Sequence, residues 1–362
     1  MNEKEKLVLE MIKKNPYLSQ QEMASQLSIS RPTLANIISG LIKKGEIIGR
    51  AYILPEKEAV IVIGGANVDR KFHIHGDVKV GSSNPALVSI SVGGVARNIA
   101  ENMGRLGNSV KLISVLGQDQ DAALIEEQSS MYIDLDLVEK MDSEKTGSYT
   151  AVLDKNGELV LGLANMSIYD SLLPDIFKKH ESILANARCM IVDLNCPKET
   201  VEYLKDIAMK RNIEFAIIPV SAVKMKNAPD NLKGVSYFIC NLEEAETYLN
   251  GRIEQLVDCE LAIERLIQMG AKNVVLTLGD NGVYIGNESG IKHIQAVRVN
   301  EVSDVTGAGD AFVGATMHGV LNGESFEDAV KMGLYNASKT IESDKTVRDN
   351  LSHEELTNWR NC

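Results

Sequence analysis

Apolar and polar residues recur with helical spacing through residues 1–45 of the chain. Ser19 opens the pattern Ser-Gln-Gln-Glu, which is typical of the start of a helix. Ser30 has the same role ahead of a further helix, with Pro32 in the first turn, where proline is tolerated. The pattern over residues 47–54 favours a short hairpin. Residues 1–55 are therefore predicted to form three short helices followed by a wing.

The pattern changes after residue 58 to short, continuous apolar runs. Runs of this length without alternation are typical of parallel strands that are buried on both faces. They occupy residues 59–63, 110–115, 190–194, 213–220, 237–240 and 274–277. Segments with helical spacing separate them, for example from Lys198 onward. Alternating strands and helices predict an α/β fold with a doubly wound sheet.

Two further segments are rich in β-forming residues but lack a continuous apolar run. Residues 71–92 contain short β-prone pieces separated by turns. Residues 147–163 contain two pieces that flank Asn156-Gly157, a dipeptide that strongly favours a hairpin turn. We therefore expect short strands here, outside the series of buried strands.

Length and charge divide the chain in the same way as the pattern does. The 362 residues suffice for two or three domains. Residues 1–55 hold 8 basic and 5 acidic residues and so carry a net charge of +3. The remaining residues carry −15, and the whole chain therefore carries −12. This asymmetry predicts a small basic module attached to an acidic body.

Cysteine content and apolar runs indicate where the protein acts. The chain has five cysteines, an odd number, and no Cys-x-x-Cys pair, which argues against a disulfide framework or a metal site. No apolar run reaches the ~18 residues that a membrane span needs, and the charged N-terminus does not resemble a signal peptide. We therefore expect a cytoplasmic protein without a membrane partner.

The stretch 304–320, DVTGAGDAFVGATMHGV, carries the strongest candidate chemistry. Gly307, Ala308 and Gly309 open a segment with helical spacing. Unpaired N–H groups and the positive end of the helix dipole then form an anion site. Asp310 follows at once and would repel a bound phosphate, but it suits a general base for an attacking hydroxyl. The alternative is a plain turn with Asp310 as the helix cap.

Two other polar positions follow buried strands. Asp69 comes after the glycines that end the 59–63 run, at the edge of the sheet where α/β proteins bind ligands. Its carboxylate can hold two sugar hydroxyls, although a single Asp there is more often a turn residue. Gly93 and Gly94 let a substrate approach the backbone, and Asn98 offers an amide to a hydroxyl.

These stretches resemble the two signatures of the ribokinase-like (PfkB) sugar and nucleoside kinases. The resemblance extends over most of the chain and implies a ribokinase-like kinase domain over residues 59–362, with a small β lid at about 71–92 and 147–163. In that family the Gly-Ala-Gly loop forms the anion hole and the following Asp is the catalytic base, here Asp310. The implied cofactors are ATP and Mg²⁺.

The resemblance also assigns binding residues. Those expected to contact the substrate are Asn67, Asp69, Gly93, Gly94, Asn98 and Asn165. Those expected on the nucleotide side are Asn241, Thr277, Gly279 and Gly282. Asn241 and Glu244 would hold Mg²⁺ through water, although their spacing also suits a plain helix cap. Asp304 and Thr306 match positions that hold K⁺ or another monovalent cation in some relatives.

Residues 1–55 resemble a winged helix-turn-helix that binds double-stranded DNA. The third helix would offer Arg31, Thr33 and Asn36 to bases, and Lys43, Lys44 and Arg50 would contact phosphates. A small helical interaction module is the alternative. A homodimer is expected, because the lid is a common pairing surface in the resembling kinases.

For the substrate, residues 83–107 and 219–224 resemble bacterial pseudouridine kinases most closely. Those kinases commonly have Asp before the Pro-Val-Ser stretch, where this chain has Ile218. The implied reaction is ATP-dependent phosphorylation of pseudouridine at its 5′ hydroxyl. Phosphorylation of ribose, fructose or another nucleoside is the alternative reaction. In a further alternative, the chain is a transcription regulator that only senses a sugar or nucleoside.

Overall fold

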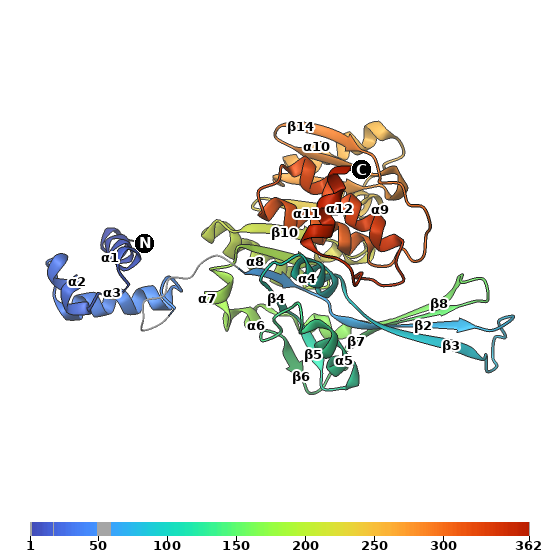
Figure 1. The fold of residues 1–362 in the computed structure, drawn as a ribbon, viewed down its shortest axis with the longest axis horizontal. Helices are drawn as coiled ribbons and strands as arrows, with labels where there is room; N and C mark the ends of the chain where they lie inside the picture. Colours follow the sequence, from blue (N-terminus) through green and yellow to red (C-terminus); the bar gives the residue numbers. More distant parts are fainter. Residues whose placement is uncertain (1, 17, 49–58, 362) are drawn as a thin grey trace.

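The computed structural model describes residues 2–16, 18–48 and 59–361 (Figure 1). The N-terminal module has helices α1 (Glu3–Lys14), α2 (Gln20–Gln26) and α3 (Arg31–Lys43). Ser19 and Ser30 cap α2 and α3, as predicted from their positions. Most of the predicted hairpin at 47–54 lies outside the described residues.

A separate small core holds the three N-terminal helices together. Val8, Met23, Leu34 and Leu41 are fully buried within it. Burial of each such side chain contributes on the order of 1.5–3 kcal/mol to folding. The end of α3 also touches the rest of the protein, because the Asn186 amide donates to the Gly45 carbonyl oxygen at 2.8 Å.

The body is built on one eight-stranded sheet in the order β14-β13-β12-β11-β10-β9-β1-β4. The strands are β1 (Val60–Ile63), β4 (Val110–Ile113), β9 (Cys189–Asp193), β10 (Glu214–Ile218), β11 (Tyr237–Asn241), β12 (Asn273–Thr277), β13 (Val283–Asn287) and β14 (Gly290–Ile294). The six strands from β4 to β12 are parallel, and β13 and β14 are antiparallel to their neighbours. The carboxyl ends of the parallel strands therefore share one edge of the sheet.

Helices cover both faces of this sheet, which confirms the doubly wound α/β fold. Val60 and Val62 of β1 belong to one core, and Ile61 and Ile63 belong to the other, because successive side chains of a strand point to opposite faces. The first core contains α4 (Val95–Arg105), α5 (Gln120–Ser129), α11 (Ala308–Leu321) and α12 (Phe326–Ile341). The second contains α6 (Pro174–Lys178), α7 (Glu181–Leu184), α8 (Lys198–Arg211), α9 (Leu242–Leu249) and α10 (Leu256–Gln268).

A four-stranded sheet in the order β3-β2-β7-β8 extends from the body (Figure 1). It contains β2 (Asn67–Ile74), β3 (Ala86–Gly93), β7 (Gly147–Leu153) and β8 (Leu159–Asn165). Residues 71–92 were predicted to hold short strands separated by turns; they hold β2 and β3, which form an antiparallel hairpin and are longer than expected. Only residues 64–66 separate β1 of the main sheet from β2. We call this second sheet the lid sheet.

The remaining elements are small. The predicted strand 110–115 is divided between β4 and β5 (Val115–Gly117), and β5 pairs with β6 (Glu139–Met141). The Ser114 hydroxyl between them donates to the Gly64 carbonyl oxygen, so the chain changes direction there. The short helix α13 (His353–Leu356) packs near the C-terminus. No helix within the described ranges has the length and apolar character to cross a membrane.

Candidate active site

Gly307 begins α11 in a conformation that only glycine adopts easily. Its φ is +82°, and a Cβ there would lie 2.3 Å from the Thr346 carbonyl oxygen. The helix that follows directs its first N–H groups toward the loop. Gly307 is the N-cap residue and no side chain caps this helix, so the alternative that Asp310 is the cap is wrong.

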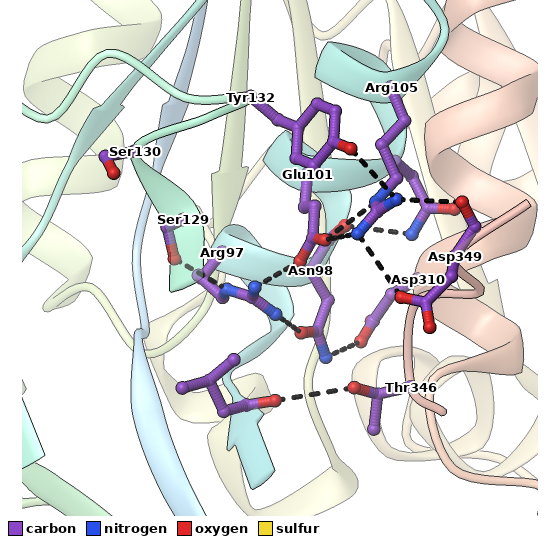
Figure 2. A network of polar contacts seen from close by, with 12 residues as sticks. Arg97, Asn98, Glu101, Arg105, Ser129, Ser130, Tyr132, Asp310, Thr346 and Asp349 are labelled. Atoms are coloured by element: carbon purple, nitrogen blue, oxygen red, sulfur yellow. Dashed lines mark hydrogen bonds and ion pairs between the residues drawn. The ribbon is translucent and has the colours of Figure 1, made fainter. Parts of the chain in front are cut away.

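The Asp310 carboxylate instead faces α4. Its Oδ2 accepts a hydrogen bond of 2.8 Å from Nδ2 of Asn98. These residues are 212 positions apart in the chain, and each belongs to one of the two recognised signatures. The fold therefore brings the first and the second signature together at the amino ends of two helices (Figure 2).

The predicted substrate residues on β2 meet the glycines that precede α4. The Asn67 amide donates to Asp69 Oδ1 at 2.6 Å. A Cβ on Gly93 would lie 2.2 Å from Asp69 Oδ2, and a Cβ on Gly94, whose φ is +98°, would lie 2.4 Å from the Gly65 carbonyl oxygen. Both glycines are therefore required by close approach. The chain is packed this tightly because the carboxyl end of β1, the lid sheet and α4 converge there.

Asn165 lies apart from this group. It is exposed at the end of β8, where it pairs with Ser148 of β7. Since β7 stands between β8 and β2, about 9–10 Å separate Asn165 from the β2 backbone. Within the described residues, no hydrogen bond joins Asn165 to Asp69 or Asn98. Its place in the site stays a prediction.

The two carboxylates of the site have raised pKa values. Burial is the main cause for Asp310, whose pKa rises to about 7; the nearby charges of Asp193 and Asp69 add to the rise, and the Asn98 hydrogen bond opposes it. Burial likewise raises the pKa of Asp69 to about 6. A base with a pKa near the working pH can both accept and release a proton efficiently. The arrangement at Asp310 therefore suits general-base catalysis.

Asp193 was not predicted from the sequence. It is buried at the end of β9 and accepts hydrogen bonds from the backbone N–H groups of Gly65, Ala96 and Asn195 at 2.9–3.0 Å. It thus joins the loop after β1 to the start of α4. A carboxylate inside an apolar run, Met-Ile-Val-Asp-Leu, is the signal in the sequence that could have identified it.

Arg97 was also missed, although it adjoins the predicted Asn98. It is only 2% exposed. Its guanidinium group donates to Ser129, to the Asn98 side-chain oxygen and to Glu101 (Figure 2). A buried arginine is unusual, and the signal available in the sequence is an arginine directly before Asn98, within the signature itself.

A cavity of about 580 Å³ lies at the carboxyl ends of β11 and β12. It is lined by three of the four residues predicted on the nucleotide side, Asn241, Thr277 and Gly279. Gly282 does not line this cavity. It turns the chain into β13 with φ +81°, and a Cβ there would lie 2.1 Å from the Ile294 carbonyl oxygen. The cavity is a suitable size for a nucleotide.

Asn241 and Glu244 form a reciprocal helix cap. The Asn241 N–H donates to Glu244 Oε2 at 2.8 Å, and the Glu244 N–H donates to Asn241 Oδ1 at 2.9 Å. The capping alternative is therefore present in the structure. Because Glu244 Oε2 is used by the cap, Oε1 is the oxygen of this carboxylate that could hold a Mg²⁺ ion through water. Mg²⁺ needs few direct protein ligands. The pair fits that role alongside its capping role.

Asp304 and Thr306 make different contacts from those expected of a monovalent-cation site. Asp304 Oδ1 accepts from the Thr306 N–H at 2.9 Å and from its hydroxyl at 2.6 Å. The Lys71 ammonium group, from the lid sheet, pairs with Asp304 Oδ2. A protein cation thus already neutralises this carboxylate. As they lie, these side chains do not fit an additional K⁺ ion, because two adjacent cations repel each other.

Five of the six predicted DNA-binding residues are described by the structure, and they lie on α3 or directly after it. Arg31, Thr33, Asn36 and Lys43 are exposed. Lys44 is different, because its ammonium group pairs with Glu5 of α1 at 2.8 Å. The sixth residue of that prediction, Arg50, lies outside the described residues.

Comparison with known proteins gives two family matches. Residues 57–352 match the family described as pfkB family carbohydrate kinase, and residues 1–47 match the family described as winged helix-turn-helix DNA-binding. The chain is 30% identical over 300 residues to the pseudouridine kinase of Escherichia coli (strain K12), covering 82% of this chain and 95% of that protein. It is 28% identical over 335 residues to the uncharacterized sugar kinase YeiI of the same organism, covering 92% of each.

Solved structures share the fold of the body. The Arabidopsis thaliana ribokinase complexed with ribose and ATP has a TM-score of 0.73 with this chain at 20% sequence identity. The match covers 83% of this chain and 98% of that one. At this level of identity the likeness establishes the arrangement of helices and strands.

Proposed function

Because the chain belongs to the pfkB family of carbohydrate kinases, we propose that it transfers the γ-phosphoryl group of ATP to the 5′ hydroxyl of pseudouridine. The observation that carries the choice of acceptor is the 30% identity to a pseudouridine kinase along 95% of that protein's length. The supporting stretch, residues 83–107, includes β3, α4 and the glycines beside Asp69.

In this proposal each residue of the site has a defined task. Asp69 and Asn67 hold ribose hydroxyls, since a carboxylate and an amide can together accept from and donate to a diol. Asp310 takes the proton of the attacking hydroxyl. The N–H groups that follow Gly307 stabilise the charge on the transferred phosphoryl group. Bound ATP supplies that group, and Mg²⁺ neutralises its phosphates.

A screen of acceptors tests the proposal. The full-length protein is incubated with Mg-ATP and pseudouridine, uridine, inosine, ribose or fructose, and ADP release is measured with a coupled assay. We expect pseudouridine to give the highest kcat/KM, and mass spectrometry to place the phosphate on the 5′ oxygen. A clear preference for ribose or fructose would overturn the choice of acceptor and leave the kinase assignment intact.

The N-terminal module is proposed to bind double-stranded DNA. Support comes from the family match over residues 1–47 and from the exposed polar side chains at the start of α3. We propose that residues 1–55 and 59–362 form the two domains. We also propose that this DNA-binding kinase acts in the cytoplasm. Selection from a random DNA pool with full-length protein is expected to enrich one sequence.

A homodimer paired through the lid sheet is also proposed. Leu87, Ile90, Leu161 and Leu163 of this sheet are each more than half exposed, and apolar surface of this kind favours association. Light scattering of the wild type and of Leu161→Lys is the test. A wild type that stays monomeric at micromolar concentration would exclude this dimer.

One alternative function is a regulator that senses a nucleoside without phosphorylating it. The pairing of Asp310 with Asn98 argues against it, since a sensor does not need a positioned base. Turnover by the wild type and its loss in Asp310→Asn would exclude a pure sensor. Binding of pseudouridine without any release of ADP would favour it.

A further inference from the structure

The Arg97 side chain lies behind Asn98, on the opposite side of that amide from Asp310 (Figure 2). Arg97 Nη1 donates to Asn98 Oδ1 at 3.0 Å, and Asn98 Nδ2 donates to Asp310 Oδ2 at 2.8 Å. The three side chains form a continuous series of hydrogen bonds from the first turn of α4 to the carboxylate of Asp310. None of the tasks assigned above requires Arg97.

The N–H groups of Arg97 determine which end of the Asn98 amide faces Asp310. A guanidinium group has five N–H donors and no acceptor, so it can pair only with the oxygen end of the amide. The reverse orientation would place NH₂ against the guanidinium group of Arg97 and the amide oxygen against the carboxylate of Asp310. Both contacts would then be repulsive. The –NH₂ end therefore faces Asp310 and has a second hydrogen free for an acceptor oxygen.

Neighbouring residues hold Arg97 in this position. Its Nε donates to the Ser129 hydroxyl at 3.0 Å, and its Nη2 pairs with the Glu101 carboxylate. Arg105 binds the other oxygen of Glu101 at 2.7 Å. Arg97 and Glu101 are only 2% and 4% exposed. A buried ion pair of this kind costs desolvation energy and is weak evidence of a stabilising role, so its position beside the site needs another explanation.

We infer that Arg97 is a positioning residue for phosphoryl transfer: it fixes Asn98 as a hydrogen-bond donor to Asp310 and to the acceptor hydroxyl. The inference rests on the proposed kinase function and adds a residue to it. The charged and titratable groups that influence Asp310 are Asp193 of β9, Asp69 of β2 and Arg97 itself. Arg97 is the cation among them, and its charge favours the ionised form of the base.

The test uses Arg97→Met and, as a matched control, Arg105→Met. Both substitutions remove a cation from Glu101, but only the first removes the contact with Asn98. We expect Arg97→Met to lower kcat about 10- to 100-fold, the equivalent of one charged hydrogen bond, with little change in the KM for ATP. Arg105→Met is expected to lower the melting temperature with a smaller effect on kcat. Arg97→Lys, which keeps the charge, is expected to recover part of the loss.

A titration separates this inference from the proposed function. ¹³C NMR of carboxyl-labelled aspartate follows the Asp310 pKa, and Asp310→Asn identifies the resonance. We expect a higher Asp310 pKa in Arg97→Met and Asn98→Ala than in wild type and Arg105→Met, and a rise in the double variant of Arg97 and Asn98 that is smaller than the sum of the two single rises. Equal pKa and kcat values in Arg97→Met and Arg105→Met would overturn the inference. If no acceptor is phosphorylated, the proposed function fails and the titration alone decides.

Discussion

Asp310 is the residue on which the proposed reaction depends most. Asp310→Asn removes the proton acceptor but keeps a similar shape, so folding and ATP binding should persist. We expect kcat to fall about 10²–10⁴-fold, the usual contribution of a general base. Steady-state kinetics and nucleotide binding by calorimetry provide the measurement. Retention of most of the activity would remove Asp310 from the mechanism.

The raised pKa of Asp310 predicts a pH dependence of activity and of stability. With a pKa of about 7, the base is protonated in acid, so kcat should decline as the pH falls below 7. Because the unfolded chain ionises this carboxyl near its ordinary pKa of 3.8, the same shift means that stability falls as the pH rises from 3.8 to about 7 and then levels off. Asp310→Asn should therefore melt at or above the wild-type temperature at pH 8, with a smaller difference at pH 5. A lower melting temperature of the variant at pH 8 would contradict this account.

Asp69 is predicted to act in binding rather than in proton transfer. Asp69→Ala removes a charged acceptor for substrate hydroxyls, so affinity for the acceptor should fall about 10- to 150-fold. Asp77→Ala, at the exposed tip of the same hairpin, is the control and should leave KM unchanged. An unaltered KM and kcat in Asp69→Ala would place this residue outside the site.

At this scale the sequence predicted residues that belong to local motifs. Asp310 and Asn98 were identifiable because each lies within a signature of a few residues. Lys71 and Asp193 were not identifiable in this way. Lys71 pairs with Asp304, 233 positions away, and Asp193 accepts from Gly65, 128 positions away, so only the fold brings these groups close. A motif shows which groups are present, and the tertiary structure decides which of them meet.

At the scale of elements, strand β2 connects the lid sheet to the segment that precedes α11. Its Lys71 neutralises Asp304, three residues before Gly307. We therefore predict that the wild type has the same kcat with K⁺ as with tetramethylammonium. In Lys71→Met the carboxylate loses its counter-ion, so activity should fall and added K⁺ should restore part of it.

The control for Lys71 is its neighbour on β2. Arg70→Met breaks an ion pair with Asp121 and leaves the catalytic loop untouched. It should show no dependence on K⁺. Strong activation of the wild type by K⁺ would show that an ion and not Lys71 serves Asp304.

The elements themselves were predicted to differing degrees. Continuous apolar runs identified the six parallel strands of the main sheet to within a few residues, because burial on both faces leaves a strong pattern, whereas the antiparallel strands β13 and β14 were not predicted. The lid sheet was harder to predict, since its exposed strands carry no such signal. In addition, β2 pairs with β7, and the chain forms β3, α4, β4, β5, α5 and β6 between these two strands. Pairing between distant strands is a property of the fold and not of either segment.

For the whole molecule, the separation of charge predicts how DNA binds. The basic module should contact phosphates, and the acidic body should face away. Lys43→Ala and Lys44→Ala form a matched pair on neighbouring residues, because only Lys44 is held by Glu5. Lys43→Ala should lower the slope of log K against log salt by about 1, the value for one phosphate contact, and Lys44→Ala should lower it less.

Binding titrations at several salt concentrations provide the measurement for this pair. Asn36→Ala should relax sequence preference without changing the salt slope, because it is expected at a base edge. Equal slopes for the wild type and Lys43→Ala would remove Lys43 from the interface. Failure to enrich any sequence at low salt would contradict DNA binding itself and leave the kinase assignment unaffected.

The short connection 64–66 between β1 and β2 makes the lid sheet a lever with its fulcrum beside Asp69. β1 is held between β9 and β4 in the main sheet, so any swing of the hairpin tip would turn the chain near Asp69. A force applied at the tip, which joins Ile74 to Ala86, would be transmitted to Asp69, the residue proposed to hold the sugar. In the reverse direction, a sugar bound at Asp69 would change the position of the hairpin tip. Lengthening the tip should then change the affinity for the sugar, although the inserted residues would lie far from Asp69.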